Sequence, residues 1–253
     1  MTSSPDPKTI QQPTPEELRE RLAELRAARG FLLPHHGVMA AAMPDLHRAY
    51  LDMYRAVTLT ERRLTPIEKE IVWLAILVTT GESIGTHHLE LLRQAGGDTE
   101  MAASVIRLAG YAPVFDALSF ADGHWRDYLP GLNAQRHYQD GFDRLRDGVP
   151  AEASELALLS VQAARGERHA IAYHIRRCYE LGIAEEAIAE ALGYLMWPCG
   201  VNVFLEACTI WQHLIRAKEV EASPLFAVWG EMEGLGAYNP ALGGAGPGAF
   251  DRD

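Results

Sequence analysis

Cysteines are scarce in this sequence, and none of them forms a redox motif. The 253 residues include three cysteines, Cys178, Cys199 and Cys208, and no two of them are spaced as Cys-x-x-Cys. An odd number of scattered cysteines does not make the even framework of a disulfide-stabilised secreted domain. We therefore expect a reduced protein without structural disulfides.

Long apolar runs and positive charge are also lacking. No apolar run approaches the roughly 20 residues needed to span a bilayer, and residues 1–14 lack the basic start and apolar stretch of a secretion signal. Lys and Arg total 23 against 34 Asp and Glu, for a net charge of −11. This balance disfavours nucleic acids and anionic membranes as partners. We expect a cytoplasmic protein without either partner.

Alternating strand patterns are absent as well, and most periodic segments are typical of helices. Thr14-Pro15 and Thr65-Pro66 are capping-box starts with proline at the first helical position. We therefore predict an all-α fold. Forty-eight per cent of the residues are apolar, an ordinary proportion for a globular protein with a sizeable core. The predicted helices cover residues 15–29, 44–57, 66–80, 83–95, 98–108, 113–129, 151–165, 168–181, 184–196 and 199–217.

One block of the sequence is present twice. Glu70 and Gly81 recur 85 positions later as Glu155 and Gly166, and the repeat continues with an offset of 86. The residues that recur at 86 are His88, Gly96, Ala121 and Trp125, which become His174, Gly182, Ala207 and Trp211. A duplication of this kind predicts two similar helical units packed on each other.

The repeats define the expected domain organisation. We predict a disordered N-terminus (1–14), an N-terminal helical extension (15–59), a first repeat (60–130), a linker (131–150) and a second repeat (151–218). An irregular C-terminal arm (219–253) follows, because its glycine-rich stretch is unfavourable for helix. Its aromatic side chains suggest that the arm lies across the body or a neighbouring subunit.

Each repeat carries a glutamate and a histidine on successive predicted helices. The neighbours three and four positions from Glu70 are apolar: Pro66, Ile67, Trp73 and Leu74. A carboxylate on such a buried face favours its neutral form and can exchange a proton near neutral pH. A single buried glutamate more often caps a helix or bonds a buried arginine, and a single histidine is more often a satisfied core residue. The recurrence as Glu70 with His88 and Glu155 with His174 favours two acid–base pairs.

Other chemistry has weaker support in the sequence. His87 faces about 100° away from His88 on a helix and is either a surface residue or a substrate contact. The closest approach to a metal-binding spacing is the isolated pair His87 and Glu90, so we expect no metal. Cys178 follows His174 by one turn, and a buried structural thiol is the preferred interpretation. Neither a Gly-x-Ser-x-Gly motif nor a glycine-rich phosphate loop is present.

The repeated pattern resembles a known superfamily. A Glu-Ile or Glu-Leu pair, a histidine 18 or 19 residues later and a glycine eight residues beyond it resemble the carboxymuconolactone decarboxylase and alkyl hydroperoxidase D superfamily. The resemblance covers residues 60–130 and 150–217. Its hydroperoxidase branch places Cys-x-x-Cys between glutamate and histidine, where the second repeat has Glu167 and Ala170. The resemblance therefore implies the cysteine-free decarboxylase branch, with alkyl hydroperoxidase D-like helical units.

The resemblance also implies a function. We expect a cofactor-free lyase for a small carboxylated lactone or unsaturated acid from aromatic breakdown, assembled as a trimer or a dimer. His174 or His88 would supply a proton, Glu155 or Glu70 would orient the imidazole, and Arg177 could hold a substrate carboxylate. The alternatives are isomerisation, hydration or lactone opening by the same residues, a peroxidase-related protein, or a non-catalytic binding protein. If one copy is inactive, we expect it to be the first, whose spacing is shorter.

Overall fold

The computed structural model describes residues 13–232, and every regular element within that range is helical. The prediction of an all-α fold is confirmed. The chain forms two compact units, Met1–Arg62 and Arg63–Asp253, which are described separately. The predicted disorder of the N-terminus falls almost wholly on residues 1–12, outside the described range.

The first unit consists of three helices and a short π-helical segment. They are α1 (Pro15–Arg29), α2 (Pro34–Ala42), α3 (Pro44–Tyr54) and the π-helical Arg55–Leu59. The Thr14 side chain caps α1 and forms a capping box with Glu17, as the sequence predicts. Helix α2 was not predicted, and the helix expected over 44–57 ends at Tyr54 before its π-helical continuation.

Histidines, rather than aliphatic side chains alone, fill the centre of this unit. His36 and His47 are buried, and Arg29 Nη1 lies 3.1 Å from His36 Nε2. Burial, together with the charges of His35, Arg29 and His47, lowers the pKa of His36 to about 4. The unit therefore holds neutral imidazoles that resist protonation.

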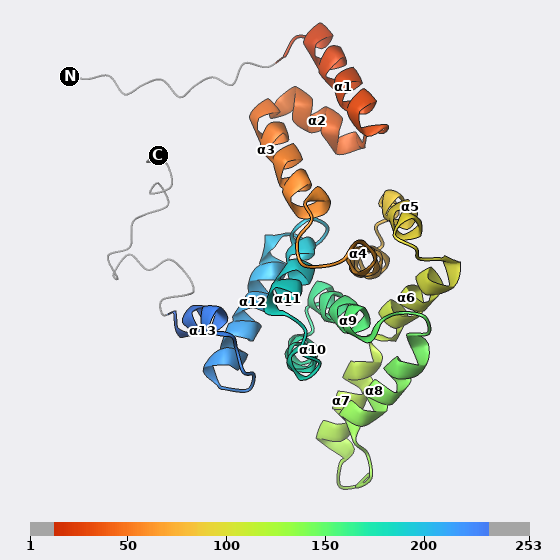
Figure 1. The fold of residues 1–253 in the computed structure, drawn as a ribbon, viewed down its shortest axis with the longest axis vertical. Coiled ribbons are helices and arrows are strands. Elements are labelled where there is room, and N and C mark those ends of the chain that lie inside the picture. Colours follow the sequence, from red (N-terminus) through yellow and green to blue (C-terminus); the bar gives the residue numbers. More distant parts are fainter. Residues whose placement is uncertain (1–12, 233–253) are drawn as a thin grey trace, which may run out of the picture. The chain divides into compact units, whose positions relative to one another are not determined.

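The second unit contains both copies of the repeated block (Figure 1). The first copy forms α4 (Pro66–Thr80), α5 (His87–Gln94), α6 (Thr99–Tyr111) and α7 (Val114–Trp125). Helix α8 (Ala134–Leu145) precedes the second copy, which forms α9 (Ala151–Arg165), α10 (Arg168–Glu180), α11 (Glu185–Gly193), a 3₁₀ turn (Tyr194–Met196) and α12 (Val201–Arg216). Helix α13 (Pro224–Glu231) follows.

Helices α4 and α9 form the centre of this unit. They pack against each other, with α5 and α6 against α4 and with α10 and α11 against α9. Every residue from 70 to 77 and from 153 to 163 is buried, which is typical of helices enclosed on all sides. Both helices end at a glycine with positive φ, Gly81 (66°) and Gly166 (75°), a conformation that L-residues rarely adopt. The two equivalent glutamates therefore lie on the two most enclosed helices.

Each copy is tied to the other by an equivalent residue of its third helix. Ser104 Oγ on α6 donates to the carbonyl of Asp147, just before α9, at 2.7 Å. Its equivalent on α11, Glu190, accepts from the backbone N–H groups of Arg63 and Leu64, just before α4, at 2.8 and 2.9 Å. The exchange is reciprocal, so the entry to each central helix is held by the other copy.

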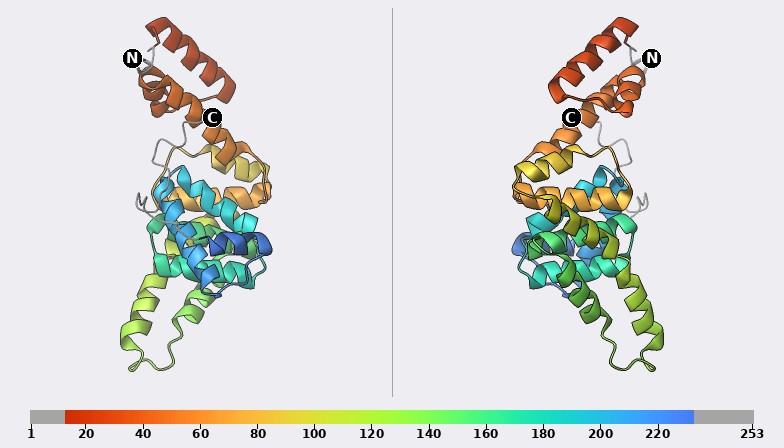
Figure 2. Two further views of the ribbon diagram at one scale, coloured as in Figure 1. Left: turned by 90° about the vertical axis from the view of Figure 1, so that its left-hand side faces the viewer. Right: turned by 90° about the vertical axis from the view of Figure 1, so that its right-hand side faces the viewer.

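The segment expected as a linker contains helix α8. Its apolar face buries Tyr138 and Phe142, and it packs against α6 and α7. Figure 2 shows α7 and α8 as the two arms of a hairpin. The prediction of a linker overlooked the amphipathic stretch that forms this helix.

Helix α5 is shorter than predicted and begins at His87 rather than near Ser83. The Glu82 side chain accepts a hydrogen bond from the Ile84 N–H at 2.7 Å, which closes a turn where the helix was expected to begin. Its counterpart α10 begins directly after Glu167. His88 consequently lies in the first turn of its helix, whereas His174 lies in the middle of α10.

The beginning of the C-terminal arm is helical rather than irregular. Ser223 caps α13, and the Phe226 ring stacks on Trp211 of α12 with centroids 5.1 Å apart. Gln212 donates to the Trp229 carbonyl at 2.9 Å. The arm therefore lies on the body of its own chain up to Met232, and the glycine-rich stretch lies outside the described residues.

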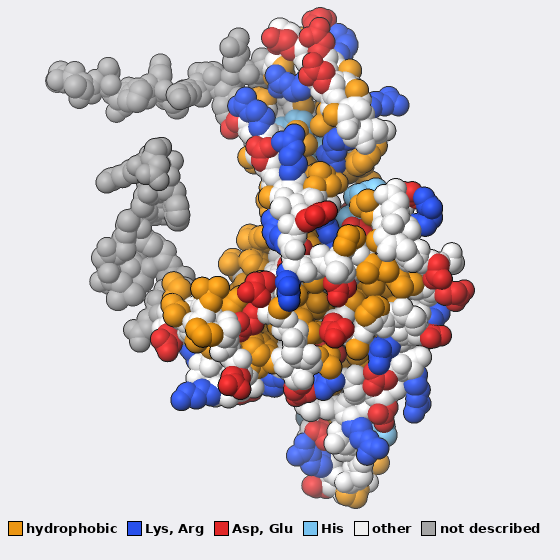
Figure 3. Space-filling view, in the orientation of Figure 1, with side chains coloured by type: hydrophobic (Ala, Val, Ile, Leu, Met, Phe, Trp, Pro, Cys, Tyr) orange, Lys and Arg blue, Asp and Glu red, His pale blue; other side chains and the backbone are white. Residues whose placement is uncertain are grey.

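One segment, Thr99–Trp125, is long and apolar enough to cross a membrane by length and composition alone. It consists of α6 and α7, which are separated at Ala112 and Pro113. Val105, Leu108 and Phe115 from this segment are buried in the core. Figure 3 shows acidic and basic side chains interspersed over the visible face. About a third of the apolar window is buried in the core (33%), whereas Phe120 and Trp125 of the same segment are about half exposed.

The buried histidines make the first unit sensitive to acid. Because the pKa of His36 is lowered to about 4, the unfolded chain binds more protons than the folded unit between that value and about pH 6.5. We expect the stability of this unit to fall as the pH decreases through that window. Hydrogen-exchange protection factors of residues 15–59, corrected for intrinsic rates, should decrease between pH 7 and pH 5. His36→Gln, which does not titrate, should weaken the dependence; equal protection at both pH values in the unmodified protein would contradict the interpretation.

Candidate active site

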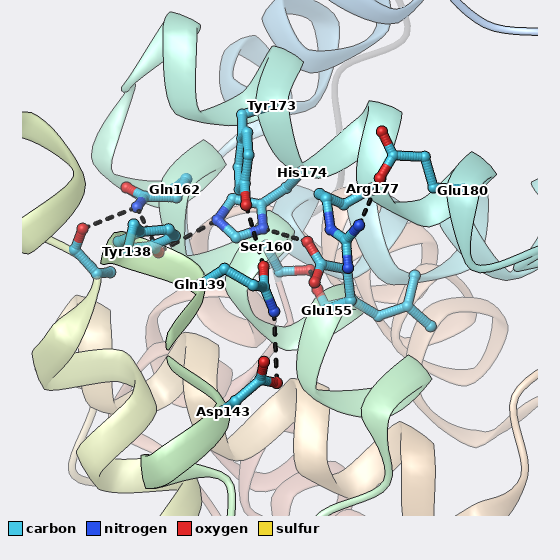
Figure 4. Close-up of polar contacts among 12 residues, drawn as sticks. Tyr138, Gln139, Asp143, Glu155, Ser160, Gln162, Tyr173, His174, Arg177 and Glu180 are labelled. Carbon is cyan, nitrogen blue, oxygen red and sulfur yellow. Dashed lines mark hydrogen bonds and ion pairs between the residues drawn. The ribbon is translucent and has the colours of Figure 1, made fainter. Parts of the chain in front are cut away.

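The predicted pair in the second copy is formed and completely enclosed. Glu155 extends from α9 and His174 from the adjoining α10, with Oε1 and Nδ1 2.5 Å apart. Both side chains have no exposed surface. Polar groups that are buried this deeply must satisfy each other, because water cannot do so. The structure therefore brings together the two residues that the sequence paired (Figure 4).

The other imidazole nitrogen of His174 is also in contact with a side chain. The hydroxyl of Tyr138, from α8, lies 3.2 Å from His174 Nε2. Burial raises the pKa of Tyr138, so its hydroxyl keeps its proton. Sequence reasoning missed this residue because the segment was interpreted as a linker. The spacing of Tyr138 and Phe142, one helical turn apart in a polar stretch, was the available signal.

A chain of polar contacts continues beyond Tyr138. Gln162 Nε2 donates to the Tyr138 hydroxyl at 3.4 Å and to the Ala112 carbonyl at 2.9 Å. Arg165 Nε donates to Gln162 Oε1 at 3.2 Å, and Arg165 Nη2 bonds Asp116 at 2.7 Å. The site is thus connected through buried side chains to an ion pair nearer the surface.

Arg177, the predicted contact for a substrate carboxylate, lies beside the pair (Figure 4). It forms an ion pair with Glu180, and its side chain is 26% exposed. Burial acts to lower the pKa of Arg177, but the hydrogen bond with Glu180 and the charge of Glu155 outweigh it and raise the pKa. Within residues 13–232, Arg177 Nε and Glu155 Oε2 are buried without a hydrogen-bond partner.

The first copy forms the same pair in different surroundings. His88 Nδ1 lies 2.6 Å from Glu70 Oε2, and both side chains are at most 5% exposed. The Trp73 ring stacks on His88 at 4.6 Å and on Tyr194 at 5.1 Å. His87 is half-buried, with its ring 4.1 Å from that of His88. His88 rather than His87 therefore occupies the position equivalent to His174.

The two copies differ at the positions that surround the second pair. The residues equivalent to Gln162, Arg165 and Arg177 are Leu77, Thr80 and Leu91. The residue equivalent to Trp73 is Leu158. The first pair therefore has an aromatic neighbour where the second has a leucine, and it lacks the neighbouring cation. The symmetry of the backbone does not extend to the chemistry of the two sites.

The residues near the two pairs do not favour thiol or metal chemistry. Cys178 is fully buried, and burial raises its pKa well above the ordinary value, which keeps the thiol neutral and unreactive. Across residues 13–232, no group of three or more His, Cys, Asp or Glu side chains could hold a metal ion. The second pair with Tyr138 and Arg177 is the best-developed polar site that the structure describes.

The buried pair makes a measurable contribution to stability. Glu155→Leu removes the acceptor for His174 Nδ1 and should lower the free energy of unfolding by about 3–5 kcal/mol, the cost of breaking a buried pair. Glu155→Gln keeps an acceptor oxygen there and should cost less, about 1 kcal/mol. Urea unfolding measures both, with Glu152→Gln on the exposed face of α9 as control. Equal losses for Leu and Gln would contradict the assigned hydrogen bond.

Comparison with known proteins agrees with this geometry. The family model described as the carboxymuconolactone decarboxylase family matches residues 44–122 and 133–213. A search of curated proteins finds no significant match. Each matched segment contains one of the two Glu–His pairs, and the second also contains α8. The matched segments cover more than half of the chain, which is therefore a tandem two-repeat member of the carboxymuconolactone decarboxylase family that lacks the Cys-x-x-Cys motif.

Proposed function

We propose that this protein is a cofactor-free lyase that decarboxylates a small carboxylated lactone or unsaturated acid of the kind formed in aromatic breakdown. The observation that carries the proposal is the enclosed Glu155–His174 pair with Arg177 beside it. Family membership supports a related chemistry. The enclosed pair supplies an acid and a base, and Arg177 supplies a cation for a substrate carboxylate.

The proposed reaction needs only a proton and a site that excludes water. The bond between the carboxylate and the carbon skeleton breaks, carbon dioxide leaves, and the electron pair remains on the skeleton as an enolate. The Glu155–His174 pair then delivers a proton to that carbon and regains one from solvent. A buried site favours loss of carbon dioxide because the substrate carboxylate is less well solvated than in water.

Within this proposal the second copy performs the chemistry and the first has a structural role. The second pair has a neighbouring arginine, and a tyrosine hydroxyl lies at the far nitrogen of its histidine. The first pair is stacked against Trp73 instead. This assignment agrees with the expectation that the first copy is the inactive one if either is.

The alternatives use the same residues or none of them. Isomerisation, hydration or lactone opening would use the same acid–base pair without loss of carbon dioxide. A peroxidase-related role has less support, because the cysteines do not form Cys-x-x-Cys and burial raises the pKa of Cys178. A non-catalytic binding protein would bind the acid and leave it unchanged.

Turnover of carboxymuconolactone tests the proposal directly. We expect stoichiometric release of carbon dioxide, and mass analysis of the product separates this reaction from isomerisation or ring opening. His174→Gln should lower kcat/KM by about 100-fold or more, because it breaks the Glu155–His174 pair, and general acid–base catalysis usually contributes that much. His88→Gln, the matched control in the first copy, should change it by no more than about threefold. Unchanged turnover in the His88→Ala/His174→Ala double variant would show that the acid–base proposal is wrong.

We also propose that the protein assembles as a homo-oligomer, a trimer or a dimer. Apolar side chains on and just after α7 are half or more exposed in the single chain: Phe120 (52%), Trp125 (50%) and Tyr128 (83%). Exposed apolar patches of this kind mark interaction surfaces. Light scattering coupled to size-exclusion chromatography should give the mass of two or three chains, and Trp125→Asp should shift it towards one. Asp127→Asn is the control, and a monomeric unmodified protein would refute the proposal.

A further inference from the structure

Two buried polar atoms of the second site could each form a further hydrogen bond. Glu155 Oε2 and Arg177 Nε have no hydrogen-bond partner among the described residues, and the charge of Glu155 acts on Arg177. A buried donor or acceptor left unpaired costs about 1–3 kcal/mol. Such groups are rare in folded proteins and call for an explanation, such as a bound water, ion or ligand. Among the described residues, His47 Nε2, Thr58 Oγ1 and Trp73 Nε1 are also unpaired, but only at the second pair do an unpaired acceptor and an unpaired cationic donor occur together.

The orientation of Gln162 can be deduced from its neighbours. The Ala112 carbonyl can only accept a hydrogen bond, so the Gln162 amide nitrogen faces it, at 2.9 Å. Arg165 can only donate, so the amide oxygen faces Arg165, at 3.2 Å. The same amide nitrogen lies 3.4 Å from the Tyr138 hydroxyl. Gln162 therefore donates to the tyrosine oxygen.

The Tyr138 oxygen receives a hydrogen from Gln162, and we assign its own hydrogen to His174 Nε2, the acceptor 3.2 Å away. His174 Nε2 is then the unprotonated nitrogen, and Nδ1–H donates to Glu155 Oε1 at 2.5 Å. Both nitrogens of His174 are used within the protein. The only open atom of the pair is Glu155 Oε2.

We propose that Glu155 Oε2, and not His174, exchanges the proton with the ligand, and that the ligand is a small carboxylate held by Arg177 Nε–H beside Glu155. His174 and Tyr138 are positioning residues behind Glu155. This inference deepens the proposed function, on which it rests for its catalytic consequence. The partly exposed side chain of Arg177 connects the enclosed carboxylate with the surface.

The proposal has a consequence for protons. Two carboxylates at one buried site repel each other unless they share a proton. A carboxylate that binds beside Glu155 should therefore take up about one proton with it. In catalysis, the shared proton moves from Glu155 Oε2 to the carbon from which carbon dioxide has left, and Glu155 is reprotonated from solvent.

The first copy does not offer this arrangement. Leu77 and Leu91 stand where the second copy has Gln162 and Arg177. At these two positions the first copy offers the Glu70–His88 pair neither a group that orients the hydrogen bonds nor a cation that holds an anion. We expect one carboxylate site per chain rather than two.

Isothermal titration calorimetry with γ-butyrolactone-γ-carboxylate tests the inference. This probe carries the ring and the carboxylate, and γ-butyrolactone is the matched ligand without the carboxylate. We expect one probe per chain and uptake of about one proton, measured from heats in buffers of different ionisation enthalpy. Absence of binding, equal affinity for the uncharged lactone, or binding without proton uptake would each overturn the inference.

Three variants assign the effect to the named atoms. Arg177→Gln should weaken binding at least about tenfold through loss of a charge-assisted hydrogen bond, whereas Arg176→Gln, at an arginine that pairs with Glu219, should not. Glu155→Gln should still bind the probe but without proton uptake, because its amide donates a hydrogen permanently. Unchanged affinity in Arg177→Gln or unchanged proton uptake in Glu155→Gln would refute the assignment.

The direction of the hydrogen-bond chain has its own readout. Nitrogen-15 NMR of histidine-labelled protein should show that His174 carries its proton on Nδ1. The signal of His174 is the one that His174→Gln removes, and a proton on Nε2 alone would overturn the assignment.

Failure of the proposed function is distinguishable from failure of this site. Turnover of carboxymuconolactone by Arg177→Gln at the unmodified rate would leave the function standing without the site. Probe binding with proton uptake but no turnover of any lactone would leave the site without the function.

Discussion

The hydrogen bond between Glu155 and His174 is the interaction on which this structure depends. Helix α9 is enclosed over eleven consecutive residues, from Ala153 to Ala163, and an enclosed helix tolerates an ionisable side chain only when a partner is built for it. His174 supplies that partner from α10, and the connection between the two helices, at Gly166 and Glu167, keeps them adjacent. Burial makes the hydrogen-bonded pair necessary, and it also keeps water away from the pair. An acid–base pair that is shielded from water can transfer a proton to a bound ligand rather than to solvent.

Duplication has produced two copies of this constraint with different outcomes. Each glutamate forms a hydrogen bond with the histidine of its own copy, so both buried central helices keep the pair. Around the second pair, Gln162 and Arg177 add a polar chain and a cation, whereas the first pair is stacked against Trp73. The reciprocal ties from Ser104 and Glu190 make each copy part of the other's support. The two pairs therefore occupy equivalent positions and differ in the side chains around them.

Membership of the carboxymuconolactone decarboxylase family places the chain in a scaffold whose chemistry depends on what lies beside the glutamate and histidine. Here the positions that could hold a redox-active cysteine pair carry Glu167 and Ala170. The cysteine nearest to the site, Cys178, is buried, and burial raises its pKa. The polar groups that remain are those of proton transfer and anion binding. These groups favour a reaction of a carboxylic acid over the reduction of a peroxide.

The sequence by itself determined the helical class, the duplication, the capped helices α1 and α4, and the two Glu–His pairs, because these depend on signals within a few residues or on a repeat at constant spacing. It could not reveal that α8 contributes Tyr138 to the second site, because a short, mostly polar helix resembles a linker in the sequence until its apolar face is seen packed against other helices. Only the tertiary structure decided that Tyr138 meets His174, 36 positions away, and that Arg177 lies beside Glu155 with an unpaired donor. Which buried polar atoms lack a hydrogen-bond partner depends on how side chains from distant parts of the sequence pack together, and no local pattern in the sequence records that packing.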